Sequence, residues 1–322
     1  MDKRRLGTTQ LEITPIGLGC MQFAGSGLVE GFYPVLAETA VHAVVRAALD
    51  AGISWFDTAE MYGRGRSERS LTTALRGCGI EPGEVVIATK WAPLARTASS
   101  ITRTVDARLA SLQGFPIDLH QIHMPYGSVS SLSRQVHAMA KLAEERKVSA
   151  VGVSNFSARQ MEKASRLLRS YGITLAANQV QINLLHRDVE RNGVLETAGR
   201  LGVSLIAYAP LRMGILTGMF HDDPARARSL PVMRRMAVGH GNRKLARTAP
   251  LIEELRAIGK AHGASAGQVA LSWLITFYGD TVVAIPGASK PHHATESAGA
   301  MDIRLTPTEL ERLDVVSRRC GG

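Results

Sequence analysis

The sequence predicts one α/β domain, a closed barrel in which eight parallel strands alternate with helices. Three observations predict it. Short apolar runs rich in β-branched residues recur eight times, and longer segments with helical periodicity lie between them. Several of those segments begin with Ser or Thr and end near Gly, as helices do. Continuous apolar strands fit a parallel sheet covered on both faces, and eight such units match a (β/α)8 TIM barrel better than an open sheet.

The strand candidates follow one another at regular intervals along the chain. They are residues 16–20, 53–59, 85–90, 118–123, 150–155, 175–181, 204–210 and 282–287. The segments with the clearest helical periodicity are 38–52, 100–112, 132–146, 157–172, 249–263, 265–279 and 306–319. No linker or low-complexity tract interrupts the series, so we expect a single domain over residues 1–322.

Two stretches fall outside the repeat. Residues 3–14 predict a small hairpin that plugs the bottom of the barrel. Residues 212–248 are rich in Arg, Gly and Pro and are too long for an ordinary connection. Segments of this size are usually functional or disordered, and we expect this one to be unordered without a cofactor.

Composition limits the protein class. The chain has 322 residues, of which 45% are hydrophobic and 20% charged, as in ordinary globular proteins. Cys20, Cys78 and Cys320 are odd in number and widely spaced, which argues against a disulfide framework and a metal cluster. The start "MDKRRLGTTQ" lacks the apolar core of a signal peptide, and no run approaches the roughly 18 apolar residues of a membrane helix. We therefore expect a cytoplasmic protein with no membrane partner and no metal.

The basic charge leaves several partners open. The net charge of +10 permits nucleic acid or an anionic small molecule. The densest basic stretch, residues 224–247, has no interleaved aromatic residues of the kind that stack on bases. A solvated loop is the first interpretation of this stretch and a phosphate-bearing cofactor the second, and nucleic acid is not expected.

Polar side chains stand at the carboxyl ends of the strands, where barrels of this kind have their active sites. Each has a structural alternative, such as a helix cap for an acid or a core position for a histidine. The alternatives weaken because so many ionisable types converge on one face. These residues are Asp57, Lys90, His123, Ser154, Asn155, Gln179, Tyr208 and Pro210.

The stretch "WFDTAEMYGRGRSE" adds a phenol, Tyr62, just beyond a strand. A free phenol has a pKa near 10, and we expect a protonated Lys90 to lower it. Burying that ammonium requires a counter-ion, for which Asp57 is placed. With His123 bonded to the same carbonyl oxygen, Tyr62 becomes a general acid for a developing alkoxide.

An alkoxide requires a hydride donor, which implies a nicotinamide cofactor because side chains cannot donate hydride. The nearest approach to a Rossmann fingerprint, "GSGLVEG" at 25–31, has the wrong glycine spacing. The cofactor must therefore be bound by the loops of the barrel.

Seven motifs in this order, "FDTAEMYG", "ATKW", "QIHMP", "VGVSNF", "NQVQ", "AYAPL" and "IPGAS", resemble those of the aldo-keto reductase superfamily, and the similarity runs nearly from end to end. The resemblance implies that Asp57, Tyr62, Lys90 and His123 are the catalytic residues. It also implies NADP(H) bound in an extended form across the mouth, with hydride leaving from the A face. Ser154, Asn155 and Gln179 would hold the carboxamide, and Tyr208 would stack on the nicotinamide.

The resemblance implies a further set of cofactor contacts along the loops. The family often has Arg or Lys shortly after "IPG" to bind the 2′-phosphate, whereas this chain offers a weaker set with no bidentate arginine. NADP(H) is therefore preferred and NAD(H) possible, and the Arg-rich segment is a candidate to compensate. The additional residues are Gly19, Cys20, Met21, Pro210, Leu211, Gly214, Leu216, Arg243, Ile285, Gly287, Ser289, Lys290, His293, Glu296 and Ser297.

The substrate is predicted to be a small carbonyl compound in an aromatic-walled pocket made by Phe23, Trp55, Trp91 and Tyr126. Aromatic aldehydes, ketosugars and natural-product ketones all remain open. Two other functions also remain open. Lys90 ends a strand as a Schiff-base aldolase lysine does, and the chain also resembles potassium-channel β subunits, which use this fold as a cofactor-sensing module. The oligomeric state is not predicted.

Overall fold

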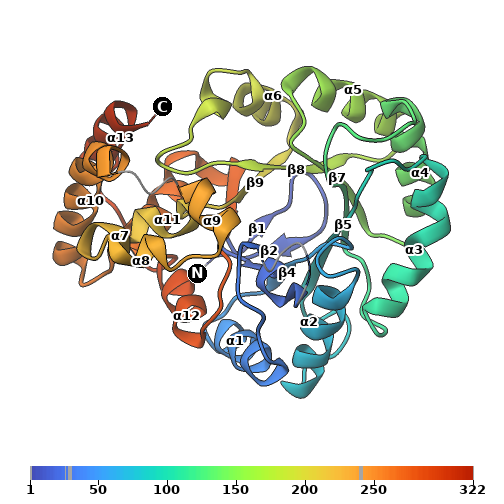
Figure 1. Ribbon diagram of the computed structural model, residues 1–322. Coiled ribbons are helices and arrows are strands. Elements are labelled where there is room, and N and C mark those ends of the chain that lie inside the picture. Colours follow the sequence, from blue (N-terminus) through green and yellow to red (C-terminus); the bar gives the residue numbers. More distant parts are fainter. Residues whose placement is uncertain (1, 26, 28–30, 239–241, 322) are drawn as a thin grey trace.

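The computed structural model describes residues 2–25, 27, 31–238 and 242–321. Eight parallel strands are arranged in the order β3 to β10 around a barrel, and helices surround them (Figure 1). The strands are β3 (Leu18–Gly19), β4 (Trp55–Asp57), β5 (Val86–Trp91), β6 (Leu119–Ile122), β7 (Ala150–Ser154), β8 (Leu175–Gln181), β9 (Ser204–Tyr208) and β10 (Val282–Ile285).

Helices cover the strands, and seven of them overlap the helical segments that the sequence predicted. The covering helices are α1 (Glu38–Asp50), α2 (Arg66–Gly77), α3 (Ser99–Ser111), α4 (Leu132–Glu144), α5 (Ala158–Arg169), α6 (Val194–Leu201), α10 (Asn242–His262), α11 (Ala266–Phe277), α12 (Pro291–Gly299) and α13 (Pro307–Cys320). Short 3-10 helices are η1 (Met21–Ala24), η3 (Asp188–Glu190) and η5 (Gly279–Thr281). Side chains of Ser131, Ser157, Ser265 and Thr306 cap α4, α5, α11 and α13, as the Ser and Thr positions predicted.

The barrel closes between its first and last strands. Gly17 N donates to Ala284 O at 2.9 Å and Gly19 N to Pro286 O at 3.0 Å. Isolated parallel bridges at Ile16–Ala284 and Gly19–Gly287 continue the ladder. All eight predicted strands and the closed barrel are confirmed.

The predicted hairpin is also confirmed. Strand β1 (Arg4–Arg5) pairs antiparallel with β2 (Glu12–Ile13), and the hairpin lies over the barrel opening in Figure 1. Leu6 and Ile13 are buried against Trp55 and the other side chains that fill the barrel interior. The hairpin therefore closes the end of the barrel opposite the carboxyl ends of the strands.

Residues 212–248 differ from the prediction. The structure describes η4 (Arg212–Thr217), α7 (Met219–Asp222), α8 (Ala225–Arg228) and α9 (Val232–Val238), and α10 begins at Asn242, before the predicted 249. A small separate core stabilises the segment, and it contains Ile215, Phe220, Ala227, Val238 and Leu245. Most of these helices have only four to seven residues, too few to show a periodicity in the sequence.

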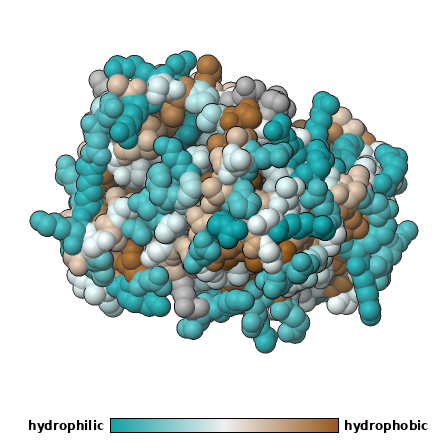
Figure 2. Space-filling model, turned by 90° about the horizontal axis from the view of Figure 1, so that it is seen from below, coloured by the Kyte–Doolittle hydropathy of each residue, from teal (hydrophilic) through white to brown (hydrophobic). Residues whose placement is uncertain are grey.

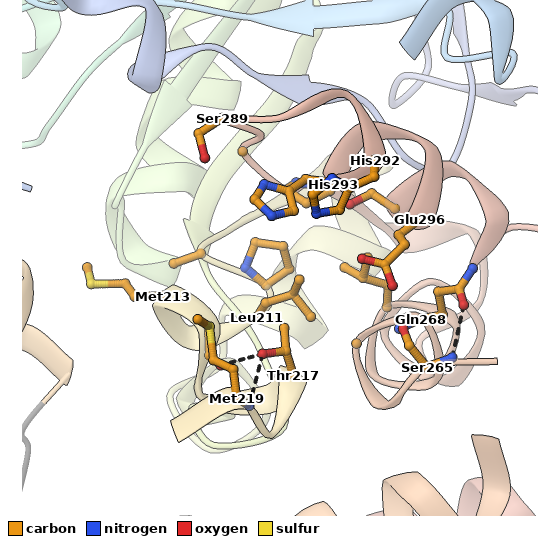
Figure 3. Close-up of a pocket in the computed structure, with 18 of the residues that line it drawn as sticks. Leu211, Met213, Thr217, Met219, Ser265, Gln268, Ser289, His292, His293 and Glu296 are labelled. Atoms are coloured by element: carbon orange, nitrogen blue, oxygen red, sulfur yellow. Dashed lines mark hydrogen bonds between the residues drawn. The ribbon is translucent and has the colours of Figure 1, made fainter. Parts of the chain in front are cut away.

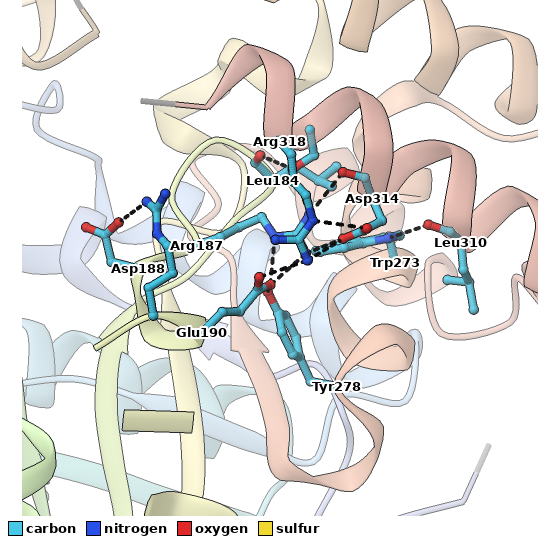
Figure 4. A network of polar contacts seen from close by, with 11 residues as sticks. Leu184, Arg187, Asp188, Glu190, Trp273, Tyr278, Leu310, Asp314 and Arg318 are labelled. Carbon is cyan, nitrogen blue, oxygen red and sulfur yellow. Dashed lines mark hydrogen bonds and ion pairs between the residues drawn. The ribbon is translucent and has the colours of Figure 1, made fainter. Parts of the chain in front are cut away.

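The C-terminal helix is attached to the barrel by a buried cation (Figure 4). Arg187 is only 8% exposed and forms ion pairs with Glu190 and with Asp314 of α13. Its guanidinium carbon lies 4.9 Å from the ring centroid of Trp273. Burying this charge is tolerated because two carboxylates and an aromatic face surround it.

The surface in Figure 2 is mostly hydrophilic, with apolar residues in small separate patches. Scattered apolar residues of this kind are normal on protein surfaces. In the described part of the chain, no helix combines the length and apolarity that a bilayer crossing requires.

Candidate active site

Asp57 and Lys90 form a buried ion pair at the carboxyl ends of β4 and β5. Lys90 Nζ lies 2.5 Å from Asp57 Oδ1, and the two side chains are 0% and 2% exposed. Nζ also donates to Thr58 O at 2.8 Å. Gln179 and Gln121 donate to the other carboxylate oxygen, at 2.8 and 3.3 Å. The carboxylate thus has a cation on one oxygen and two amide donors on the other, which offsets much of its desolvation.

Tyr62 lies over this pair because of the turn that follows it. Gly63, Arg64 and Gly65 have φ values of 65°, 54° and 86°, a left-handed run that glycine adopts most readily. A Cβ on Gly63 would lie 1.9 Å from the carbonyl oxygen of Ala24. Lys90 Nζ lies 5.3 Å from the centroid of the Tyr62 ring. The two glycines therefore allow the close approach that holds the phenol beside the lysine.

The electrostatics of Tyr62 correct one expectation. Burial raises the pKa of Tyr62, the charge of Lys90 lowers it and that of Asp57 raises it, and the net shift is upward. The predicted net lowering is wrong because desolvation outweighs the lysine. Burial on its own lowers the pKa of Lys90, but Asp57 and Tyr62 outweigh it and the pKa is raised. The site therefore holds a neutral phenol beside an ammonium at neutral pH.

His123 faces the same phenol. Its ring centroid lies 5.8 Å from that of Tyr62, with the planes at 82°. Burial, reinforced by Lys90, lowers the pKa of His123 to about 3. Nδ1 is buried without a partner. A neutral ring with its proton on Nε2 leaves Nδ1 as an unprotonated acceptor and keeps one N–H to donate.

A second polar group lies beside Asp57, at the ends of β7, β8 and β9. Ser154 Oγ donates to Gln179 O at 2.9 Å, and Asn155 Nδ2 donates to Ser154 Oγ at 3.1 Å. Tyr208 donates its hydroxyl proton to Asn155 Oδ1 at 3.1 Å. The structure thus brings the four predicted carboxamide and ring contacts together. The amide nitrogen of Gln179 already donates to Asp57, so this donor is committed to that carboxylate.

A cavity of about 450 Å³ continues from this group between η4 and the N-terminal ends of α11 and α12 (Figure 3). In Figure 3, His292, His293 and Glu296 face Leu211 and Thr217 across the cavity. Eight of the predicted cofactor residues line it. They are Pro210, Leu211, Gly214, Gly287, Ser289, His293, Glu296 and Ser297.

Other predicted contacts lie elsewhere. Leu216 is fully buried in the core, and Ile285 packs in the barrel interior, so both predictions are wrong as direct contacts with the cavity. Lys290 is exposed at the N-cap of α12 and does not line the cavity. The side chain of Arg243 lies outside the described residues. Gly19, Cys20 and Met21 lie beside Asp57 instead, since Cys20 N donates to Asp57 O at 2.8 Å.

Sequence reasoning missed most of the cavity lining, and two of the missed residues, Gln22 and Arg234, carry buried polar atoms without a partner. Gln22 is 92% buried, and its Oε1 has no partner. Arg234 of α9 donates from Nη2 to Met213 O at 3.0 Å, and its Nε is buried without a partner. The Arg-rich composition pointed to this segment, but the residue chosen, Arg243, was nine positions away. An unpartnered donor on Arg234 and an unpartnered acceptor on Gln22 at one cavity fit a polar ligand that carries both phosphates and hydroxyl or amino groups, such as a dinucleotide.

The charges of the cavity differ from those predicted. Burial lowers the pKa of His293, and His292 lowers it further, so this ring is neutral at pH 7. Arg226 also lines the cavity but lies 3.5 Å from Asp223 and is exposed. The guanidinium of Arg234, stacked 5.0 Å from the ring centroid of Tyr33, is the cation most fixed in place there.

The predicted aromatic pocket is wrong for three of its four residues. Trp55 lies at the closed end of the barrel and donates to Thr14 O at 2.9 Å. Trp91 follows Lys90, so strand alternation turns it outward to Ser100 of α3. Phe23 is buried in the core under η1. Tyr126 remains, 67% exposed after the end of β6.

Comparisons with known proteins agree with this geometry. The model of the Aldo/keto reductase family matches residues 15–318. An uncharacterised oxidoreductase of Mycobacterium tuberculosis is 35% identical over 95% of this chain and 90% of its own. The chloroplastic pyridoxal reductase of Arabidopsis thaliana is 32% identical over 96% of this chain and 84% of its own. An aldo/keto reductase of Klebsiella pneumoniae, solved with NADP and acetate, superimposes with a TM-score of 0.73 at 25% identity, covering 100% and 97% of the two chains.

Proposed function

Because this chain belongs to the aldo/keto reductase family, whose relatives here are oxidoreductases, we propose that it reduces an aldehyde or ketone to the alcohol with NADP(H), and that Tyr62 is the general acid. The observation that carries the proposal is the buried Lys90–Asp57 pair beneath Tyr62. A relative solved with NADP supports the choice of cofactor.

The cofactor supplies the hydride when it is bound. Ser154 and Asn155 would hold its carboxamide and Tyr208 would face its ring. In the cavity, the Arg234 guanidinium would donate to its phosphates, and Gln22 Oε1 would accept from a hydroxyl or amino group of the cofactor. These residues fit the group because they present hydrogen-bonding atoms, two of them unpartnered, in the cavity and at the strand ends next to it.

The proton would come from Tyr62. A phenol whose pKa is raised stays protonated through the neutral range, so it has a proton to donate when the carbonyl oxygen gains electrons. The Lys90 ammonium stabilises the phenolate left behind, and Asp57 keeps that ammonium in place. Neutral His123 would donate to the same oxygen and so fix the carbonyl within reach of the phenol.

The same electrostatics argue against an aldolase. A Schiff-base lysine must lose its proton, which requires a lowered pKa. Lys90 is fully buried with a raised pKa and a carboxylate partner. Borohydride in the presence of a carbonyl substrate should therefore leave Lys90 unmodified.

The test follows NADPH or NADH oxidation with an activated aromatic aldehyde and with pyridoxal, the aldehyde named for one relative. We expect Tyr62→Phe to lower kcat about 10²- to 10⁴-fold, the usual contribution of a general acid, while NADPH binding stays within twofold. Equal turnover by Tyr62→Phe would refute the mechanism. Binding without turnover of any carbonyl compound would favour the cofactor-sensing module.

A further inference from the structure

We propose that Glu60 and Arg96 form a positioning pair that fixes the loop of Tyr62 against the loops that follow Lys90 and His123. The inference rests on the proposed function, since it assigns the pair a role in the orientation of Tyr62. Neither residue touches the reacting atoms, and both lie beside the mouth of the barrel.

Glu60 stands two residues before Tyr62 and connects its loop to β5. The carboxylate oxygen Oε1 accepts from Ala92 N at 2.6 Å and from Arg96 Nη1. The main-chain N–H of Glu60 donates to Lys90 O at 3.3 Å. Glu60 thus attaches the loop of the phenol to the strand end that carries the lysine and to the segment after it.

Contacts other than the one to Glu60 fix the orientation of the Arg96 side chain. Its Nε donates to Ser100 Oγ at 3.1 Å and its Nη2 to Thr104 Oγ1 at 2.9 Å, both on α3. The guanidinium carbon lies 5.3 Å from the ring centroid of Trp91. A planar guanidinium fixed on two sides presents its remaining donors in a defined direction.

The main chain of Arg96 reaches the third loop. Its carbonyl oxygen accepts from Ser128 Oγ at 2.8 Å and from Val129 N at 3.1 Å. Ala95 N donates to Gly127 O at 2.8 Å. Residues 127–129 follow His123, so Arg96 joins the loop of Tyr62 through its side chain and the loop of His123 through its backbone.

A neighbouring cation does not replace this contact. Arg108 Nε lies 3.9 Å from Glu60 Oε2, but its Nη1 is bound to Glu68 at 3.0 Å. The Glu60–Arg96 pair is the shorter and is partly buried, with the side chains 11% and 27% exposed. The position of Tyr62 relative to Lys90 and His123 therefore depends on this pair, and a misplacement of about 1 Å can cost a hundredfold in rate.

The test compares Glu60→Gln, which keeps the volume and removes the charge, with Glu190→Gln. Glu190 is similarly buried and ion-paired but lies in η3, apart from the three loops. We expect Glu60→Gln to lower kcat about 10- to 100-fold with the NADPH dissociation constant unchanged within twofold. The alkaline limb of the pH–rate profile should move upward because Tyr62 loses contact with Lys90. Glu190→Gln should lower the stability of the fold and leave kcat unchanged. The kcat of Arg96→Lys should lie between those of wild type and Glu60→Gln.

Amide hydrogen exchange separates this inference from the proposed function. Residues 58–65 and 92–98 should exchange at least about tenfold faster in Glu60→Gln than in Glu190→Gln, whether or not a carbonyl substrate has been found. Wild-type turnover with loss in Tyr62→Phe establishes the reductase independently. Unchanged kcat in an active Glu60→Gln variant, or unchanged exchange in these two segments, would overturn the inference.

Discussion

Asp57→Asn tests how the buried ion pair contributes to the free energy of unfolding. The variant keeps the shape of the side chain and removes the charge, which leaves Lys90, 0% exposed, with the carbonyl of Thr58 as its remaining strong acceptor. The asparagine amide also cannot satisfy its neighbours. Lys90 donates to one oxygen of Asp57, and Gln179 and Gln121 donate to the other. One of these sides must now face an NH₂ group.

Removing one partner of a buried pair usually costs about 3–5 kcal/mol. For a chain of 322 residues, an unfolding entropy of about 2.1 cal/mol/K per residue converts this cost into a fall of about 4–7 °C in Tm. The double variant Asp57→Asn/Lys90→Met removes the uncompensated cation and should recover more than half of the loss. Urea unfolding followed by circular dichroism measures both.

The pH dependence gives a second check with a defined sign. The pKa of Lys90 is raised in the folded protein, so its contribution is fully present below the unfolded value near 10.4 and is lost as the pH rises above it. The difference between wild type and Lys90→Met should therefore be constant from pH 7 to 9 and shrink above pH 10.5. If the free energy of unfolding of the single variant Asp57→Asn lies within about 1 kcal/mol of the wild-type value, the reasoning is refuted, because a contribution of that size is typical of an exposed ion pair.

Two further predictions concern other charges. Arg234→Gln should raise the NADPH dissociation constant about 10- to 100-fold, the value of one or two charge-assisted bonds, whereas Arg226→Gln, already paired at the surface, should change it less than threefold. Fluorescence titration with NADPH and NADH measures this. An equal loss of affinity for NADPH and NADH in Arg234→Gln would assign Arg234 to the pyrophosphate, and a loss of affinity for NADPH alone would assign it to the 2′-phosphate. Unchanged affinity for both cofactors would contradict a role of Arg234 in cofactor binding. Burial raises the pKa of Asp118 to about 6, so its carboxyl stabilises the fold below pH 4 and that stability is lost as the pH rises through 6. As the pH rises from 4 to 7.5, the free energy of unfolding of Asp118→Asn should therefore increase relative to that of wild type by at most about 3 kcal/mol. Urea midpoints of the two proteins that differ by a constant amount over this range would contradict the raised pKa.

The sequence predicted the barrel and the ionisable residues gathered at its mouth. Each ionisable residue at the end of an apolar strand has a structural alternative, but Asp57, Lys90 and His123 share this pattern, and their convergence made the group noticeable. Strand register then brings them together, because the carboxyl ends of parallel strands meet at one mouth. The same logic failed for Trp55 and Trp91, which stand one or two positions from catalytic residues. Distance along a strand does not specify which end or which face of the barrel a side chain reaches.

The cofactor cavity was less predictable for a related reason. Its lining comes from short helices and loop positions, and these show no period in the sequence. Arg234 and Arg243 belong to the same Arg-rich segment, and nothing in the sequence distinguishes them. In the structure, Arg234 of α9 packs on the ring of Tyr33 and lines the cavity. Gln22 is adjacent to the predicted Met21, but the turn of η1 directs the glutamine inward. Candidate catalytic groups that require desolvation are therefore marked in the sequence by their apolar neighbours, whereas the phosphate contacts that we propose for an open cavity, which require only reach and charge, become apparent once the helices are placed.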